Sequence, residues 1–339
     1  MRYTYPDWPD WPTNRTVVIA EVGMNHGGNE ALAWEMINSA HENGADLVKL
    51  QSFVTEDFFH PSLSYFQNTK AMELPLDGQR RLFAKGKEAG INLITTPFGV
   101  ASVDMVEEFE PLAFKVASMD NDNHPLIEHI AKKGRPILIS LGMADLGEIQ
   151  KTVDVVRKAG NEKLVLLHCI SDYPSRLEDM HLASLQGLRQ IFNVHVGLSD
   201  HSMGLDAAFA AASMGVAVIE KHFTTDRKLC EEIPDADHDI SIEPDELRDL
   251  RRFCESVTEM IGSFPRPFTE NEATGRNEMR RGLYAKQDIE AGEPLSLDNV
   301  AFLRPVRGVR AGDWRFVQGR KSRRKIEKSA AITFADVGL

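Results

Sequence analysis

The sequence predicts an α/β protein, a (β/α)8 TIM barrel followed by a small β-rich domain. Over roughly the first 225 residues, short apolar runs rich in β-branched residues alternate with amphipathic stretches, as expected of repeated βα units. Eight such runs are present, and eight strands alternating with helices indicate a closed parallel barrel. Roughly the last 60 residues differ, with many Arg and Lys residues, short strand-like pieces and turn signals.

The expected strands and helices can be assigned in chain order. Helix-like segments include Asn29–Asn43 after the first run and Gly204–Met214 after the seventh, and Gly44 and Gly90 stand where helices should end. A doubly wound open sheet is the competing architecture, but EVGMNHGG, which starts at Glu21, is not the Gly-rich phosphate loop of such sheets. The eight runs are Val17–Glu21, Leu47–Gln51, Leu93–Thr96, Ala113–Val116, Pro136–Ser140, Leu164–His168, His195–Leu198 and Val218–Lys221.

Composition divides the chain into three parts. Residues 1–262 are expected to form the barrel, with an amphipathic helix at Pro244–Gly262 and an irregular arm over the Pro- and Trp-rich residues 1–14. Residues 263–278, with two prolines and many polar side chains, are expected to be a linker. Residues 279–339 are expected to form the small domain.

The composition also excludes several classes of protein. A net charge of −12 speaks against a nucleic-acid partner, and the basic stretch Gly319–Lys328 is better explained as a solvated face or a dimer contact. The chain has no apolar run of about 18 residues and no secretory signal at its start, so no membrane span is expected. The cysteines Cys169, Cys230 and Cys254 show no paired spacing, which fits a cytoplasmic protein, and Cys169 is expected to be a buried packing residue.

Every predicted strand ends in a side chain that can ionise or form hydrogen bonds. The carboxyl ends of barrel strands carry the chemistry in this fold, although polar residues near solvent also occur there without a function. Lys49 and Lys115 are harder to explain in that way, because a buried ammonium group is costly unless it is paired. Two lysines among hydroxyl groups suit a ligand that carries both a phosphate and a carboxylate. The strand-end residues are Glu21, Lys49, Gln51, Thr96, Lys115, Ser118, Ser140, His168, Ser171, Ser199, His201, Glu220 and His222.

Two histidines follow the seventh and eighth predicted strands, which are neighbours in a barrel. His201 and His222 can therefore point to one centre, and neutral imidazoles suit Mn, Fe, Co, Ni or Zn better than Mg or Ca. Each histidine taken singly is more often a hydrogen-bonded structural residue, and only the placement at strand ends favours a metal site. His168 is expected to be structural or to support the site, and the role of His26 is left open.

Seven motifs follow one another along the chain: IAEVGMNHGG at 19–28, VKLQ at 48–51, TTPF at 95–98, FKVAS at 114–118, LHC at 167–169, GLSDH at 197–201 and IEKHFT at 219–224. In this order they resemble the sialic acid synthase family, which includes N-acetylneuraminate, legionaminate and pseudaminate synthases. The resemblance implies a (β/α)8 barrel with a C-terminal antifreeze-like (SAF) domain. It implies an enzyme that condenses phosphoenolpyruvate (PEP) with a 2-acetamido-sugar aldehyde, giving a nonulosonic acid and phosphate by C–O cleavage of PEP. It also implies a domain-swapped homodimer, in which the small domain of one chain covers the barrel of the other.

The resemblance assigns roles to individual residues. His201 and His222 would hold a divalent metal ion, Mn²⁺ by preference with Mg²⁺ or Co²⁺ as alternatives, and would share the catalytic work with Glu21 as an acid or base. Some members have Asn where this chain has Ser171. The implied PEP-binding residues are Lys49, Thr96, Lys115, Ser118, Ser140, Ser171, Ser199 and Glu220. The implied sugar-binding residues are Gln51, Phe98, Tyr173, Asp237 and Arg304, the last reaching in from the partner chain.

The chain departs from the family pattern at two places, which leaves the acceptor sugar open. The loop after the eighth strand, Asp226–Pro244, is longer than usual, and Asp235 competes with Asp237 for the sugar contact. Val306–Trp314 also lacks the usual Gly- and Pro-rich turn. N-acetylmannosamine, a 2,4-diacetamido hexose and a phosphorylated sugar all remain as acceptors. A non-catalytic sugar-binding barrel and a metal-dependent hydrolase are the alternatives from other classes.

Overall fold

The computed structural model of the protein describes residues 7, 8, 11 and 15–339, so most of the arm expected over residues 1–14 lies outside the described residues. The chain divides into two compact units, residues 1–262 and residues 263–339. Each unit has an apolar core of its own. None of the helices in the described part of the chain is both long and apolar enough to cross a membrane.

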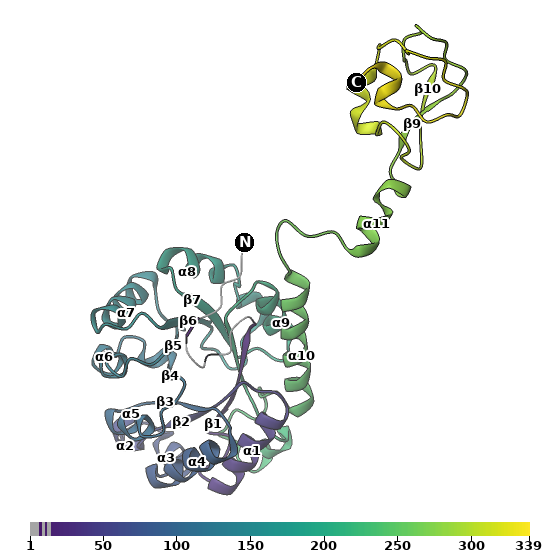
Figure 1. Cartoon of the computed structure of the whole chain (residues 1–339). Helices are drawn as coiled ribbons and strands as arrows, with labels where there is room; N and C mark the ends of the chain where they lie inside the picture. Colours follow the sequence, from purple (N-terminus) through teal and green to yellow (C-terminus); the bar gives the residue numbers. More distant parts are fainter. Residues whose placement is uncertain (1–6, 9–10, 12–14) are drawn as a thin grey trace. The chain divides into compact units, whose positions relative to one another are not determined.

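Eight parallel strands close into a barrel in the order of the chain (Figure 1). Each observed strand overlaps a predicted one, and the prediction of a (β/α)8 barrel is confirmed. The pairing of β8 with β1 places Glu21 beside His222, and the pairing of β1 with β2 places Glu21 beside Lys49. The strands are β1 (Val17–Gly23), β2 (Leu47–Ser52), β3 (Leu93–Pro97), β4 (Phe114–Val116), β5 (Ile137–Ser140), β6 (Leu164–Cys169), β7 (His195–Asp200) and β8 (Val218–His222).

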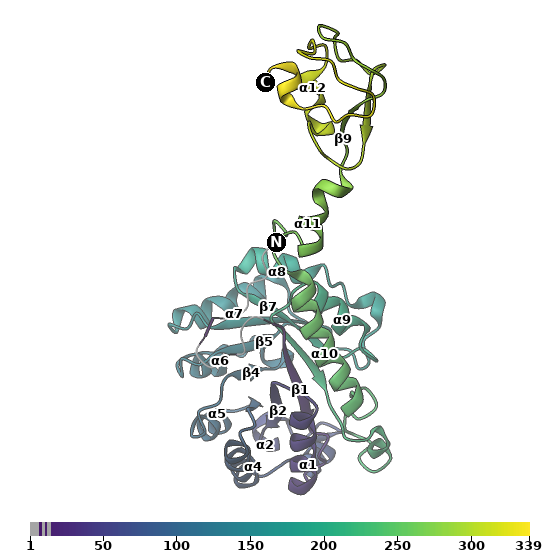
Figure 2. The same cartoon turned by 45° about the vertical axis from the view of Figure 1, so that its right-hand side comes forward.

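Helices surround the barrel and bury their apolar faces against it (Figures 1 and 2). The first begins where the side chain of Asn29 accepts hydrogen bonds from two backbone N–H groups, and α10 packs Leu247, Leu250 and Cys254 inward. α1, α9 and α10 lie where the sequence predicts helices. The helices are α1 (Glu30–Glu42), α2 (Thr55–Phe58), α3 (Phe66–Met72), α4 (Leu76–Ala89), α5 (Val100–Glu107), α6 (His124–Ala131), α7 (Leu146–Lys158), α8 (Ser184–Phe192), α9 (Asp206–Ser213) and α10 (Pro244–Ile261).

The barrel interior changes from apolar to polar along each strand. In β1, Val17 and Ile19 belong to an apolar cluster inside the barrel, and Glu21, on the same face of the strand, follows them. Trp11 packs into this cluster with 4% of its surface exposed, and the ring of Trp8 lies 5.3 Å from it. Because apolar side chains fill the beginning of the barrel, a ligand has room only at the carboxyl ends of the strands.

The second unit contains a two-stranded antiparallel sheet, β9 (Gly282–Ala285) with β10 (Val300–Leu303), and a short helix α12 (Trp314–Val317). Its core contains Leu283, Val300 and Ile332. The segment 263–278, for which the composition predicts a linker, carries the helix α11 (Glu270–Met279). This helix begins at a capping box formed by Thr269 and Glu272, and none of its residues is buried.

Candidate active site

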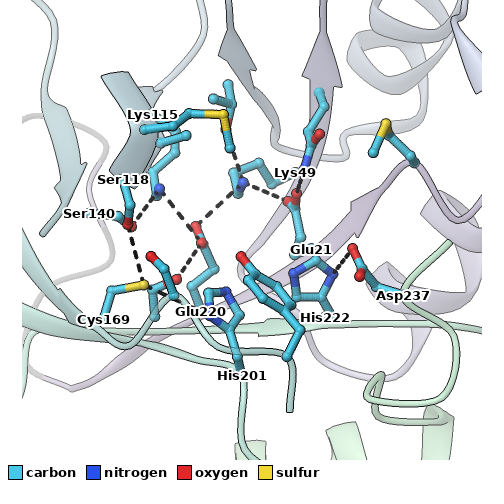
Figure 3. Close-up of a pocket in the computed structure, with 18 of the residues that line it drawn as sticks. Glu21, Lys49, Lys115, Ser118, Ser140, Cys169, His201, Glu220, His222 and Asp237 are labelled. Carbon is cyan, nitrogen blue, oxygen red and sulfur yellow. Dashed lines mark hydrogen bonds and ion pairs between the residues drawn. The ribbon is translucent and has the colours of Figure 1, made fainter. Parts of the chain in front are cut away.

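A cavity of about 400 Å³ opens at the carboxyl ends of the barrel strands (Figure 3). Side chains from all eight strands line it, together with residues of the loops that follow them. Every site residue predicted within the barrel lies in this lining, whereas Arg304 belongs to the second unit. The predicted residues in the lining are Glu21, Lys49, Gln51, Thr96, Phe98, Lys115, Ser118, Ser140, Ser171, Tyr173, Ser199, His201, Glu220, His222 and Asp237.

Lys49 and Glu21 form a buried ion pair between β2 and β1. Lys49 Nζ lies 2.7 Å from Glu21 Oε2 and 3.7 Å from Glu220 Oε2, and it donates to Thr96 Oγ1 at 3.0 Å. Gln51 Nε2 donates to the other Glu21 oxygen at 3.1 Å. Burial raises the pKa of Glu21 to about 7 in spite of Lys49, so both forms of this carboxyl group are populated near neutral pH. Burial alone would lower the pKa of Lys49, but the two glutamates outweigh it, and the ammonium group stays charged.

Lys115 of β4 contacts the opposite oxygen of Glu220. Its Nζ donates to Ser140 Oγ at 2.7 Å and lies 3.7 Å from Glu220 Oε1, which also accepts from Ser199 Oγ at 2.9 Å. Burial lowers the pKa of Lys115. At Glu220 burial alone would raise the pKa, but the two nearby lysines outweigh it and hold the pKa of that carboxyl group low. Glu220 thus lies between two ammonium groups, and hydroxyl groups adjoin both. An anion that enters the cavity would meet donors that are already aligned.

Ser118 and Ser171 converge on the loop between β5 and α7. Gly142 N donates to Ser118 Oγ at 3.0 Å, and a Cβ atom on Gly142 would collide with both serine hydroxyl groups. Glycine is therefore required for this close approach. Ser118 Oγ also donates to Cys169 Sγ at 3.4 Å. Cys169 is buried, as predicted, but it lines the cavity and is not simply a packing residue.

His201 and His222 lie side by side at the carboxyl ends of β7 and β8, with ring centroids 5.5 Å apart. His201 Nδ1 lies 2.8 Å from the carbonyl oxygen of Ile170, so we assign its proton to Nδ1 and the free lone pair to Nε2. His222 Nδ1 is buried without a hydrogen-bond partner, 3.5 Å from Asp237 Oδ2. Burial lowers the pKa of His222 well below its usual value, so this ring is neutral.

This histidine pair fits a divalent transition metal. The unpartnered Nδ1 atom of buried His222 is the observation that favours one, because a buried polar atom normally has a partner. Among the described residues, no three His, Cys, Asp or Glu side chains form a complete metal cage. His201 and His222 would be the protein residues that hold such an ion, and it would supply a Lewis acid in the cavity. Tyr173 stacks on His201 at a centroid distance of 4.0 Å and borders the same space.

Aromatic and Met side chains form an outer wall of the cavity that the sequence analysis does not assign to the site. The ring centroid of Phe58, at the end of α2, lies 4.0 Å from that of Phe98 and 4.0 Å from that of Phe59. Two consecutive phenylalanines soon after the second strand are the available signal, but strand periodicity does not indicate where a loop residue will lie. The wall residues missed are Met24, Phe58, Phe59, Met119 and Met143.

Two further histidines lie outside this lining. His168 Nε2 hydrogen-bonds the carbonyl oxygen of Met180 at 2.6 Å, in agreement with a structural role. His26 is buried in the loop between β1 and α1, where its Nδ1 accepts from Gly28 N at 3.0 Å. Neither residue therefore belongs to the cavity itself.

A profile of the NeuB family matches residues 36–265, about two thirds of the chain, and a profile of the SAF domain matches residues 280–338. The chain belongs to the NeuB family. An N,N'-diacetyllegionaminic acid synthase from Campylobacter jejuni is 34% identical over 313 residues, which cover 88% of this chain and 92% of the relative. A pseudaminic acid synthase from the same species is 30% identical over 336 residues, 95% of this chain and 96% of the relative. The crystal structure of N-acetylneuraminic acid synthetase from Leptospira borgpetersenii in complex with citrate, 32% identical, covers 78% of this chain and 91% of its own with a TM-score of 0.72.

Membership of the NeuB family fixes the class of reaction. The chain is a PEP-condensing nonulosonic acid synthase, and the predicted family resemblance and enzyme class are confirmed. NeuB-family enzymes generally use a divalent metal ion, for which the histidine pair described above is suitable. The relatives are named for different products, so family membership does not by itself select the acceptor sugar.

Proposed function

We propose that the cavity binds PEP beside Lys49 and Lys115 and an unphosphorylated 2-acetamido sugar beside His222 and Asp237, and that it joins them into a nonulosonic acid with release of phosphate. The observation that carries this proposal is the presence of two buried lysines and two histidines in one cavity. The lysine half suits an anion, and the histidine half suits a metal ion and a neutral oxygen ligand.

The residues proposed to bind PEP are lysines, hydroxyl groups and one carboxylate at the ends of β2 to β8. The contacts of Lys49 and Lys115 to Glu220 are 3.7 Å long, longer than hydrogen bonds, so an anion can compete for both ammonium groups. With the phosphate and carboxylate of PEP held, C3 of PEP is directed at the acceptor, and much of the rate gain comes from this positioning. The proposed PEP contacts are Lys49, Thr96, Lys115, Ser118, Ser140, Ser171, Ser199 and Glu220.

The reaction forms one C–C bond and breaks one C–O bond. C3 of PEP attacks the aldehyde carbon of the open-chain sugar, whose oxygen takes up a proton from solvent, and positive charge develops at C2 of PEP. Water then adds to C2, and the tetrahedral adduct expels phosphate by cleavage of the C2–O bond. Glu21 is proposed to accept a proton from this water, because a pKa of about 7 leaves it partly ionised at neutral pH. Gln51 and Lys49 hold its two oxygens in place.

His201 and His222 are proposed to hold the divalent metal ion, with Mn²⁺ as first choice and Mg²⁺ or Co²⁺ as alternatives. When bound there, the ion supplies a Lewis acid for the aldehyde oxygen. The carbonyl oxygen of Ile170 and the stacked ring of Tyr173 fix the direction of His201 Nε2. The protein thus orients the acceptor through groups that are already in place before the sugar binds.

The walls of the acceptor half favour a sugar without phosphate. Lys49 and Lys115 are the only Lys or Arg side chains in the described lining, and both are paired with carboxylates. Phe58 and Phe59 instead offer apolar surface, which suits acetamido and deoxy methyl groups. The similarity to a diacetyllegionaminic acid synthase supports a 2,4-diacetamido hexose ahead of N-acetylmannosamine. Sugar contacts are proposed for Gln51, Phe98, Tyr173 and Asp237.

We further propose a domain-swapped homodimer, in which the SAF domain of one chain completes the acceptor site of the other. Arg304 lies at the end of β10 and is exposed, so its guanidinium group is available for such a contact. The helix α11, the first helix of the second unit, has no buried residue in the described chain, so its surface is available to a partner chain.

The test is phosphate release from PEP with Mn²⁺ and a panel of sugars: N-acetylmannosamine, 2,4-diacetamido-trideoxy hexoses and N-acetylmannosamine 6-phosphate. We expect release with an unphosphorylated sugar and its loss in His201→Ala, whereas His41→Ala, at the end of α1, behaves like wild type. Release with only the phosphorylated sugar would contradict the proposed acceptor class. Failure of folded, metal-loaded protein to consume PEP with any of them would contradict the proposed reaction at this cavity.

A further inference from the structure

Asn25 joins the first and the last loop at the carboxyl end of the barrel. It lies in the β1–α1 loop, is fully buried, and makes three hydrogen bonds to residues 198 to 216 positions further along the chain. Its Nδ2 donates to the carbonyl oxygen of Phe223 and to Ser241 Oγ, each at 2.9 Å, and its Oδ1 accepts from Asp237 N at 2.9 Å. One side chain thus fixes three points of the segment that follows β8.

This segment, residues 223–243, is closed at its base without the help of Asn25. Thr224 N donates to the carbonyl oxygen of Ile242 at 3.0 Å, and Ile242 N donates to that of His222 at 2.8 Å. Arg227 Nε donates to the carbonyl oxygen of Ser241 at 2.9 Å. These hydrogen bonds join the two ends of the segment, so the positions of the residues between the ends depend on other contacts.

Asp237 is the residue of this segment that lines the cavity, and both of its peptide groups are held. Its N–H donates to Asn25, and its carbonyl oxygen accepts from Ser241 Oγ at 2.6 Å. Ser241 Oγ in turn accepts from Asn25 Nδ2. With its main chain fixed in this way, Asp237 directs its carboxylate toward His222 (Figure 3).

We propose that Asn25 is a positioning residue for acceptor binding, which holds Asp237 at the cavity without itself touching a ligand. Asn25 is absent from the cavity lining in the described structure. The two loops also pack closely, because a Cβ atom on Gly27 would come within 2.9 Å of Ile233 Cδ1. The inference rests on the proposed function, since it takes Asp237 to be a sugar contact.

The two halves of the cavity depend on Asn25 to different degrees. Without the Asn25 side chain, the carbonyl oxygen of Phe223 and the N–H of Asp237 lose their partner, and Ser241 Oγ keeps only its bond to Asp237, so the segment can satisfy the two backbone groups only by moving toward water. Asp237 would move with it. Lys49 and Lys115, by contrast, are held by the side chains of Glu21 and Ser140. The segment meets Glu21 only at its first residue, where Phe223 N donates to the Glu21 carbonyl oxygen at 2.7 Å, and this main-chain bond does not involve Asn25. Acceptor binding should therefore suffer while PEP binding persists.

Asn161 offers a matched control. Its side chain is also buried, donates from Nδ2 to the carbonyl oxygens of Ala131 and Arg135 and accepts from Lys163 N. Like Asn25, it therefore donates two hydrogen bonds and accepts one. It lies just before β6, at the opposite end of the barrel from the cavity. Asn161→Ala therefore reports the general cost of losing such a side chain.

The experiment compares Asn25→Ala and Asn161→Ala in the full-length chain, with the sugar that wild type uses best. For Asn25→Ala we expect the KM for the sugar to rise about tenfold or more, and the Kd for PEP, measured by calorimetry, to stay within about twofold, because only the acceptor half loses its support. Asn161→Ala should leave both constants unchanged. Equal effects of the two variants on the sugar KM, or parallel losses of sugar and PEP binding in Asn25→Ala, would overturn the proposal.

A second readout does not depend on turnover. Hydrogen exchange of peptides from residues 225–243 should accelerate in Asn25→Ala and not in Asn161→Ala, while peptides from β2 and β4 stay protected in both. Unchanged exchange of that segment would overturn the proposal. If wild type consumes no PEP with any sugar, the proposed function fails, and this exchange experiment still decides whether Asn25 holds the segment. Ser241→Ala, which removes one of the Asn25 hydrogen bonds and the bond to the Asp237 carbonyl oxygen, should shift sugar KM and exchange in the same direction.

Discussion

Lys115 reaches the cavity from β4, where burial lowers its pKa and Glu220 balances its charge. In Lys115→Met the chain length of the side chain is nearly kept and the charge is removed. We expect the Kd for PEP to rise about 100-fold, because the anion loses a desolvated cationic partner. Titration calorimetry checks this, with Lys87→Met, a surface lysine paired to Glu110, as control. Equal PEP affinity in Lys115→Met and wild type would remove this lysine from the PEP site.

His26 gives a prediction about stability and pH. Burial lowers its pKa to about 4, whereas the unfolded chain has the ordinary value of 6.5, so between these values the unfolded chain binds a proton that the folded chain does not. The free energy of unfolding should therefore fall as the pH drops from 6.5 to 4, by about 3 kcal/mol for this residue. In His26→Gln this contribution disappears, and urea unfolding at several pH values should show a shallower decline than wild type. His60→Gln, a substitution at an exposed histidine, serves as the reference. If the free energy of unfolding of His26→Gln falls as steeply with decreasing pH as that of wild type, this prediction is wrong.

For single residues, the sequence predicts which way a side chain points better than it predicts which groups the side chain contacts. Alternation along β1 and β2 places Glu21 and Lys49 inside the barrel, and the strand ends place them at its open mouth. The register that brings them to 2.7 Å is set by pairing between strands, which no local pattern contains. Phe58 and Phe59 are missed because they reach the cavity from a connection whose path depends on tertiary packing.

Among the elements, β7 and β8 carry a buried ion pair immediately before the two histidines of the site. Asp200 and Lys221 lie 3.1 Å apart with almost no exposed surface, and both bond to Ser202. Lys221→Met should lower the free energy of unfolding by about 3–5 kcal/mol, because the Asp200 carboxylate is left buried and unpaired.

Chemical denaturation followed by circular dichroism measures that loss. The double variant Asp200→Asn with Lys221→Met should recover part of it, since the stranded charge is then removed. If Lys221→Met is as stable as wild type, or the double variant is the less stable of the two, the pair does not support these strands in the way proposed.

The elements themselves were largely readable from the sequence. All eight strands follow from apolar runs, because a parallel barrel buries its strands on both faces and leaves little polar interruption. The helix α11 is the main addition, since the prolines and polar residues of 263–278 indicate a linker and conceal the capping box of Thr269 and Glu272. A helix without a buried face leaves no hydrophobic period to detect.

The whole molecule yields a prediction about shared sites. If Arg304 acts on the partner's barrel, Arg304→Ala and His201→Ala chains are each inactive alone, but a mixed dimer contains one complete site. Equal mixing should restore about one quarter of wild-type activity, because half of the dimers are mixed and each has one working site of two. Phosphate release after co-refolding measures it. If differently tagged chains show that mixed dimers form and yet no activity returns, Arg304 acts in the site of its own chain or in no site.

β8 closes the barrel, and it is also the last strand of the barrel that a ribosome makes. Until residues 218–222 emerge, β1 and β7 are open edges, and Lys49 and Lys115 lack the carboxylate of Glu220 that lies between them. At about 5–20 residues per second, the roughly 100 residues from Lys115 to Glu220 take about 5–20 seconds to make. Lys49 already has Glu21 as a partner at that stage, so closure of the barrel and arrival of the carboxylate that balances Lys115 are one event.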